Sequence, residues 1–186
     1  MKEKSEVGYI FKIFNSMIQT QFQTKVKVFR TNNTKDYFNY LLCEYLMDQG
    51  IVHQSSCVYT PQQNGVVERK NRHLLEMARS IMFTTNVPKY FWGKAVLTAT
   101  YLINRMPSRV LKFQTPCQAI LHSYPDTQII SSLPLKVFGC TTFVHIHQHH
   151  SSKLDPKAIK CLFLGYSPTK KGYNVTRLSL GNSMLL

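Results

Sequence analysis

The chain has 186 residues, of which 44% are hydrophobic and 17% charged, so its composition allows a packed core and argues against long disordered segments. Its 23 Lys and Arg outnumber nine Asp and Glu, and the net charge of +14 favours a polyanionic partner: nucleic acid first, an acidic membrane surface second. A basic protein without a nucleic-acid role is the alternative. There is no apolar run of the ~20 residues that a membrane helix needs, and no apolar signal-peptide segment, so we expect a protein that is neither membrane-spanning nor secreted. The five cysteines are odd in number and widely spaced, which indicates reduced thiols in a nuclear or cytoplasmic protein.

The first part of the chain alternates between helical and extended patterns. A helix is predicted over residues 5–22, with Ser5 as its N-cap, from the apolar spacing of Ile10, Phe11, Phe14, Ile18 and Phe22. A strand is predicted over residues 26–31. A second helix is predicted over residues 36–48, and a short strand begins at Ile51. This order is typical of one half of an α/β layered fold, in which functional groups gather at the carboxyl ends of the strands.

Helices dominate the next part of the chain. A long helix is predicted over residues 64–85, with Asn64 as its cap. One face of this helix carries Val67, Leu74, Ala78 and Ile81. A second helix is predicted over residues 88–105, where Trp92 and its helical neighbours are interpreted as core. A short helix follows over residues 115–122.

The sequence pattern changes after about residue 125. Prolines and glycines punctuate short β-branched and aromatic runs, including residues 137–138, which predicts a small antiparallel β module over residues 133–177. We therefore predict two domains, residues 1–124 and 133–177, joined near 125–133. The histidines within residues 145–150 have no Cys or carboxylate at zinc-ligand spacing, so a histidine-rich turn is favoured over a metal site.

Two segments carry a specific resemblance. Residues 60–72, Thr-Pro-Gln-Gln-Asn-Gly-Val-Val-Glu-Arg-Lys-Asn-Arg, look like the glutamate-bearing motif of copia-type retrotransposon integrases. Residues 28–33, Val-Phe-Arg-Thr-Asn-Asn, resemble the Arg-(Ser/Thr)-Asp-Asn-Gly segment of the same family. The 35 residues from 33 to 67 equal the family's gap between its second Asp and its Glu. Further matches at residues 101–108, 138–140, 153–157 and 163–167 extend the resemblance to about residue 177.

This resemblance implies an α/β RNase H-like integrase core followed by an SH3-like β module. In the family an Asp, Asp, Glu triad binds Mg²⁺ or Mn²⁺ for DNA integration. Glu68 takes the position of the Glu, Asn32 that of the second Asp, and the first Asp would precede Met1, so we expect a truncated core that lacks its first strands. A carboxylate offers a metal a negative charge and two oxygens, whereas an amide offers one neutral oxygen. Glu68 alone therefore leaves the metal site incomplete. We expect no productively bound metal and no catalysis. Asp36 is interpreted as an ordinary acid at a helix start rather than a substitute ligand.

The same motif supplies candidate nucleic-acid contacts. We expect six residues to face DNA phosphates: Gln62, Gln63, Asn64, Arg69, Lys70 and Arg72. The alternative is a plain basic helix face, on which Glu68 pairs with Arg72. The expected partner is DNA, either retrotransposon ends or target DNA, with RNA as an alternative; an oligomer is compatible with the resemblance. Two other functional hypotheses stay open: a basic nucleic-acid-binding remnant, and a decayed transposon copy with no enzymatic role.

Overall fold

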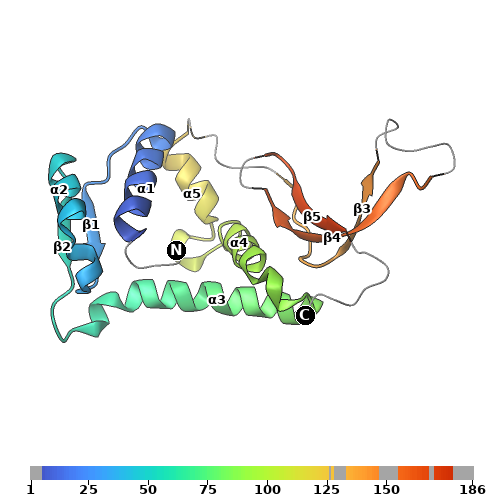
Figure 1. Cartoon of the computed structure of the whole chain (residues 1–186), viewed down its shortest axis with the longest axis horizontal. Helices are drawn as coiled ribbons and strands as arrows, with labels where there is room; N and C mark the ends of the chain where they lie inside the picture. The colour runs from blue at the N-terminus through green and yellow to red at the C-terminus, as the bar shows by residue number, and fades with distance from the viewer. Residues whose placement is uncertain (1–5, 126, 128–132, 147–154, 168–169, 178–186) are drawn as a thin grey trace. The chain divides into compact units, whose positions relative to one another are not determined.

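The fold was analysed in a computed structural model. It describes all residues except 1–5, 126, 128–132, 147–154, 168–169 and 178–186. The chain divides into two compact units (Figure 1). Unit 1 comprises Met1–Lys70 and Leu121–Ile129, and unit 2 comprises Asn71–Ile120 and Ile130–Leu186.

Unit 1 holds a short parallel sheet with helices before and between its strands. Helix α1 (Val7–Phe22) precedes strand β1 (Val28–Thr31), and helix α2 (Tyr40–Asp48) connects β1 to strand β2 (Val52–Ser55). β1 and β2 pair in parallel along their whole length. This helix–strand–helix–strand order confirms the pattern predicted from the sequence. The predicted cap Ser5 lies outside the described residues.

The core of unit 1 is formed by apolar side chains of α1, α2 and the residue before β2. Leu42, Leu46 and Ile51 are buried together with Phe11, whose ring centroid lies 4.1 Å from that of Phe29 on β1. The predicted apolar face of α1 is confirmed only in part. Phe11 is buried, whereas Ile10 and Phe14 are exposed, because α1 packs through the narrower face that contains Phe11.

The helix predicted over residues 36–48 is in fact two helices. A 3₁₀ helix, η2 (Lys35–Phe38), ends before α2, and Asn39 separates the two in an extended conformation. The Asn39 side-chain oxygen accepts a hydrogen bond from the backbone N–H of Leu41 at 3.1 Å. This N-cap starts a new helix at Tyr40, which explains why one continuous helix does not form.

The long predicted helix is present as α3 (Gly65–Thr85), and it spans the boundary between the units. The 3₁₀ helix η3 (Pro61–Asn64) precedes it, so Asn64 ends a 3₁₀ helix instead of capping α3 from outside. Leu74, Ala78 and Ile81 pack in the core of unit 2, as predicted. Val67 was predicted on the same face but is 72% exposed, because the apolar contacts of α3 begin only at Leu74.

The remaining helices begin or end at proline-containing turns. The 3₁₀ helix η4 (Lys89–Phe91) leads into α4 (Trp92–Ile103). The 3₁₀ helix η5 (Arg109–Leu111) then precedes α5 (Pro116–Ser123). The prediction that Trp92 belongs to the core is wrong. Its side chain is 62% exposed, because α4 packs through the face of Ala95, Thr98 and Ala99, which are buried.

The predicted β module of unit 2 is a three-stranded antiparallel sheet. Strands β3 (Thr141–His145), β4 (Ala158–Tyr166) and β5 (Tyr173–Arg177) lie in the order β3-β4-β5. Residues 137–138 were expected to be extended. They instead enter a turn closed by a hydrogen bond from the Cys140 N–H to the Val137 carbonyl at 3.1 Å.

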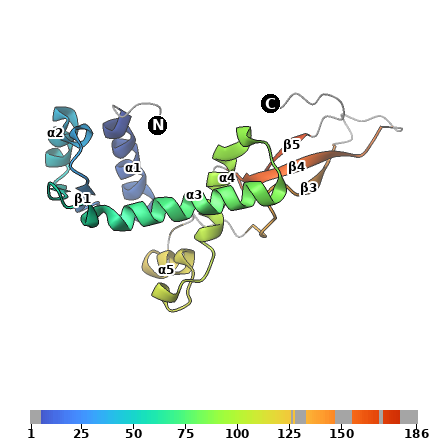
Figure 2. The ribbon, with the colours of Figure 1, turned by 90° about the horizontal axis from the view of Figure 1, so that it is seen from below.

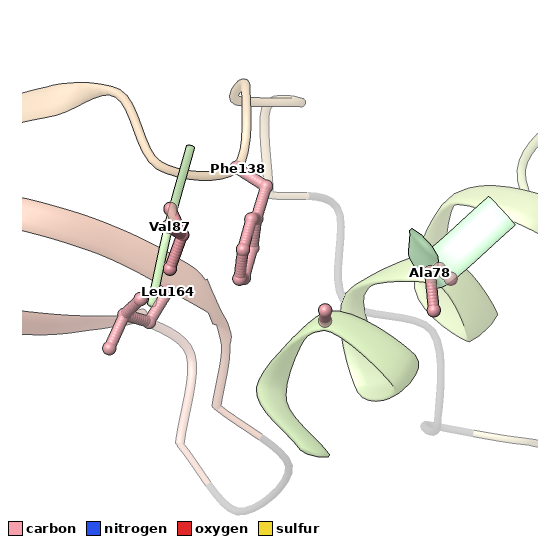
Figure 3. Close-up of a cluster of buried hydrophobic side chains, with 6 residues drawn as sticks. Ala78, Val87, Phe138 and Leu164 are labelled. Carbon is pink, nitrogen blue, oxygen red and sulfur yellow. The ribbon is translucent and has the colours of Figure 1, made fainter. Parts of the chain in front are cut away.

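The sheet shares its core with α3 and α4. Val87, Phe138 and Leu164 lie together (Figure 3). Ala95 and Ala99 of α4 belong to the same buried cluster. The sheet therefore contributes only part of this core, since the two helices supply the other part.

Two glycines allow the helices and the sheet of unit 2 to approach closely. Gly139 has φ +75°, and a Cβ there would lie 2.7 Å from side-chain atoms of Thr85 and Val87. Gly165 in β4 has φ +117°, and a Cβ there would overlap the Thr98 hydroxyl of α4. Both positions combine a positive φ with a contact too close for a larger residue.

An aromatic cluster also connects α4 to the sheet. The rings of Tyr101 and Tyr166 stack with centroids 3.6 Å apart, and the Arg105 guanidinium lies 3.4 Å from the Tyr101 centroid. The backbone N–H of Lys136 donates to the Tyr166 hydroxyl at 2.9 Å. Burial raises the pKa of Tyr101, and the opposing charge of Arg105 offsets part of that rise.

Candidate metal centre and nucleic-acid interface

The carboxyl edge of the parallel sheet positions the candidate metal ligands. The Ser56 N–H donates to the Thr31 carbonyl at 3.0 Å, so the pairing of the two strands continues just past β2. The Thr31 hydroxyl and His53 Nε2 lie 2.9 Å apart, across the strands. Asn32 follows Thr31 directly and therefore leaves the sheet at the edge where α/β folds place their functional groups.

Asn32 differs chemically from the carboxylate that the resemblance predicts. Its side chain is exposed, and its carbonyl oxygen accepts a hydrogen bond from the Thr34 hydroxyl at 3.0 Å. Thr34 itself occupies the position where the resembled segment has Gly. The amide offers a metal one neutral oxygen, which also accepts the Thr34 hydroxyl, and the group carries no charge to attract a divalent cation.

The two acidic candidates, Glu68 and Asp36, do not supply the missing charge. Glu68 lies in the first turn of α3 and is exposed. Asp36 lies in the first turn of η2, as expected of an acid at a helix start. Across the described ranges, no three His, Cys, Asp or Glu side chains gather closely enough to hold a metal ion. The donor set of Asn32 and Glu68 therefore does not fit a two-metal carboxylate site.

The loop between β2 and α3 is held together by one of the predicted DNA contacts. The side-chain oxygen of Gln63 accepts a hydrogen bond from the Cys57 N–H at 2.9 Å and so closes the loop on itself. Gln62 is exposed, and Asn64 is half-buried at the end of η3. Gln63 therefore has a structural role that sequence reasoning missed, because the six-residue spacing to Cys57 has no recognisable signature.

The three predicted basic contacts lie on the exposed surface of α3. Arg69, Lys70 and Arg72 are all exposed, and Arg69 Nε donates to the Gly65 carbonyl one turn earlier at 3.1 Å. The positions suit phosphate contact, but the local charge is mixed because Glu68 adjoins them. Their contact with DNA phosphates stays a prediction, since their hydrogen bonds in the structure give no evidence of a ligand.

The positive charge of the chain is concentrated in unit 2. Unit 2 contains 14 basic residues (Lys and Arg) and two acidic ones (Asp and Glu), which gives a net charge of +12. Unit 1 contains nine basic and seven acidic residues, which gives a net charge of +2. Between Glu76 and Asp126 the sequence contains no acidic residue at all. The attraction for a polyanion therefore comes mainly from unit 2 and not from the unit that contains Asn32 and Glu68.

The architecture defines a class of protein: a mixed α/β segment followed by a three-stranded antiparallel sheet of the SH3-like type. Residues 140–181 match the family described as the retroviral polymerase SH3-like domain. The fold is similar to the simian T-cell lymphotropic virus intasome, solved in complex with PP2A regulatory subunit B56 gamma. That likeness has a TM-score of 0.52 and 16% sequence identity, over 95% of this chain and 63% of the other.

Sequence relatives narrow this class. The chain is 38% identical to the retrovirus-related Pol polyprotein from transposon TNT 1-94 of Nicotiana tabacum, over 94% of the chain and 13% of the relative. It is 35% identical to the corresponding polyprotein from transposon RE2 of Arabidopsis thaliana, over 97% of the chain and 12% of the relative. The chain is therefore homologous to one segment of the retrovirus-related Pol polyproteins of transposons, and it spans only about an eighth of the length of these curated relatives.

Proposed function

We propose that this chain is an integrase-derived segment that binds nucleic acid and does not catalyse strand transfer by itself. The observation that supports inactivity is the side chain of Asn32, a neutral amide whose oxygen is engaged by Thr34. Two-metal phosphoryl transfer depends on carboxylates that hold the cations against the attacking and leaving oxygens. With an amide at this position, the Mg²⁺ or Mn²⁺ chemistry inferred for the family has no complete ligand set here.

The observation that supports nucleic-acid binding is the charge of +12 on unit 2. Each phosphate that a Lys or Arg neutralises releases condensed counterions, which drives association at low salt. DNA is the proposed partner, as retrotransposon ends or target DNA, with RNA as the alternative. Within the described part of the chain, no helix is both long and apolar enough to cross a membrane. Nuclear or cytoplasmic location, an oligomer, and a domain division at residues 124 and 133 remain predictions.

One protein sample tests both halves of the proposal. Strand transfer is measured on a labelled DNA end with Mg²⁺ and with Mn²⁺, and DNA affinity is measured across a salt series. We expect salt-dependent binding and no product from the unmodified chain, with Asn32→Asp, which restores the carboxylate, and Glu68→Ala as controls. Product formed by the unmodified chain and abolished by Glu68→Ala would overturn the proposed inactivity. Affinity that does not change with salt would overturn the proposed binding mode.

The alternative is that the chain is a decayed transposon copy with no function. The amide at Asn32 supports this alternative as much as it supports an inactive segment that still binds nucleic acid. Detection of the transcript and of its peptides in cells separates the two. Their presence supports a retained binding role, and their absence supports decay.

A further inference from the structure

A compact loop connects α4 to α5 (Figure 2). Its own backbone hydrogen bonds close it. The Ser108 N–H donates to the Gln114 carbonyl at 3.1 Å, and the Phe113 N–H donates to the Ser108 carbonyl at 2.9 Å. One step further out, the Cys117 N–H donates to the Asn104 carbonyl at 3.0 Å. These bonds tie the two ends of the loop together, as in an Ω-type loop, so its conformation is set before any partner arrives.

The backbone at the end of this loop is strained. Lys112 has φ 52° and ψ 45°, and Phe113 has φ 64°. Both residues adopt the left-handed backbone conformation, and neither is Gly, Asn or Asp. Two consecutive bulky residues in this conformation are rare because the side chain crowds the backbone. Such strain persists only where the surroundings enforce it, and it is most often found at binding and catalytic sites.

The strained conformation holds apolar side chains in solvent. Val110 is 90% exposed and Phe113 is 73% exposed, whereas Leu111 between them is half-buried. The loop therefore uses Leu111 for packing and keeps its aromatic ring outside the core of unit 2. An exposed ring on a rigid loop loses little conformational entropy when it contacts a partner.

Cations adjoin both of the exposed apolar residues. Arg109 precedes Val110 and Lys112 precedes Phe113, and both cations are exposed. The loop lies wholly within unit 2 and within the long segment that lacks acidic residues. This combination of an aromatic face and nearby cations suits a flexible polyanion that has accessible base faces, namely single-stranded nucleic acid.

We propose that the Ser108–Gln114 loop is a single-stranded DNA contact, in which Phe113 stacks on a base and Arg109 and Lys112 contact phosphates. This proposal rests on the nucleic-acid binding proposed above and locates part of it. Val110 extends the apolar surface beside the ring. The loop is separate in sequence from the predicted contacts at residues 62–72, so the two sites are tested independently.

The test measures binding of the full chain to a fluorescent single-stranded oligonucleotide and to the matching duplex. Phe113→Asn removes the ring but keeps a residue that tolerates φ > 0, so the loop conformation is preserved. Phe113→Tyr keeps the ring. Arg109→Gln with Lys112→Gln removes the two charges. Phe83→Ala, at a ring that is 77% exposed on α3 of the same unit, is the matched control.

We expect Phe113→Asn to weaken single-strand binding by about tenfold, in line with the loss of one base–aromatic stack, without changing the salt dependence. Phe113→Tyr and Phe83→Ala should bind like the unmodified chain. The double charge variant should reduce the slope of log K against log salt by about 1.4, or ~0.7 for each phosphate contact.

Other outcomes separate this proposal from the one on which it rests. If the unmodified chain binds but Phe113→Asn binds equally well, the loop contact is refuted and general nucleic-acid binding stands. A loss confined to duplex refutes base stacking on a single strand. If Phe113→Asn changes only self-association in sedimentation, the loop is a protein contact instead. If the unmodified chain does not bind, both proposals fail.

Discussion

Replacing Gly165 with alanine tests the close contact between α4 and the sheet of unit 2. The new Cβ must adopt φ +117° and must also displace the Thr98 hydroxyl, which donates to the Lys94 carbonyl at 2.9 Å. The positive φ costs about 1–3 kcal/mol, and overpacking costs a further 1–3 kcal/mol or so. We expect the free energy of unfolding of unit 2 to fall by about 3 kcal/mol.

The assay is urea unfolding followed by tryptophan fluorescence, because Trp92 is the only tryptophan and begins α4. Gly93→Ala, also on α4, is the matched control. A Cβ at Gly93 would meet no other side chain or element within 4 Å, so this change should stabilise unit 2 by about 0.5–1 kcal/mol. Adding Thr98→Ala to Gly165→Ala should recover the steric part of the loss but not the backbone part. If Gly165→Ala unfolds within about 0.5 kcal/mol of the unmodified chain, the inferred contact is wrong.

Two further changes examine the rest of unit 2. Phe138→Ala should lower the free energy of unfolding by about 3–5 kcal/mol, since Phe138 is 2% exposed, whereas Phe83→Ala should change it little; equal effects would contradict the assigned core. Burial raises the pKa of Tyr101 above its unfolded value of about 10, so the stability it contributes is complete below about pH 10 and is lost as pH rises through the folded pKa. Tyr101→Phe should make the fall in stability above about pH 10 shallower, and an unchanged profile would exclude Tyr101 as its source.

Apolar patterning predicted the elements of the two candidate residues but not their contacts. Asn32 follows β1 and Glu68 lies at the start of α3, as the predicted strand and helix implied. The hydrogen bond from Thr34 to Asn32 followed from no pattern, because it depends on the local turn. The role of Gln63 was missed for the same reason, since a side chain that closes its own loop leaves no periodic signal.

Apolar periodicity predicted helices more reliably than it predicted burial. Ala78 and Ile81 pack as expected, but Val67 and Trp92 satisfy the same helical spacing and are exposed. Spacing identifies a face of a helix, whereas tertiary packing decides how much of that face is covered. The positive φ of Lys112 and Phe113 could not be predicted from the sequence either, because positive φ is normally inferred from Gly or Asn and neither residue is one of these.

The uneven charge of the two units also affects folding. Only two acids offset the 14 cations of unit 2, so the cations repel one another, and this self-repulsion opposes the compact state most strongly at low ionic strength. Under the proposed nucleic-acid binding, a polyanion stabilises unit 2 to the extent that it binds the folded form more tightly than the unfolded chain. Unit 2 should therefore melt at a higher temperature with nucleic acid than without it, while unit 1, with a net charge of only +2, gains little by the same route.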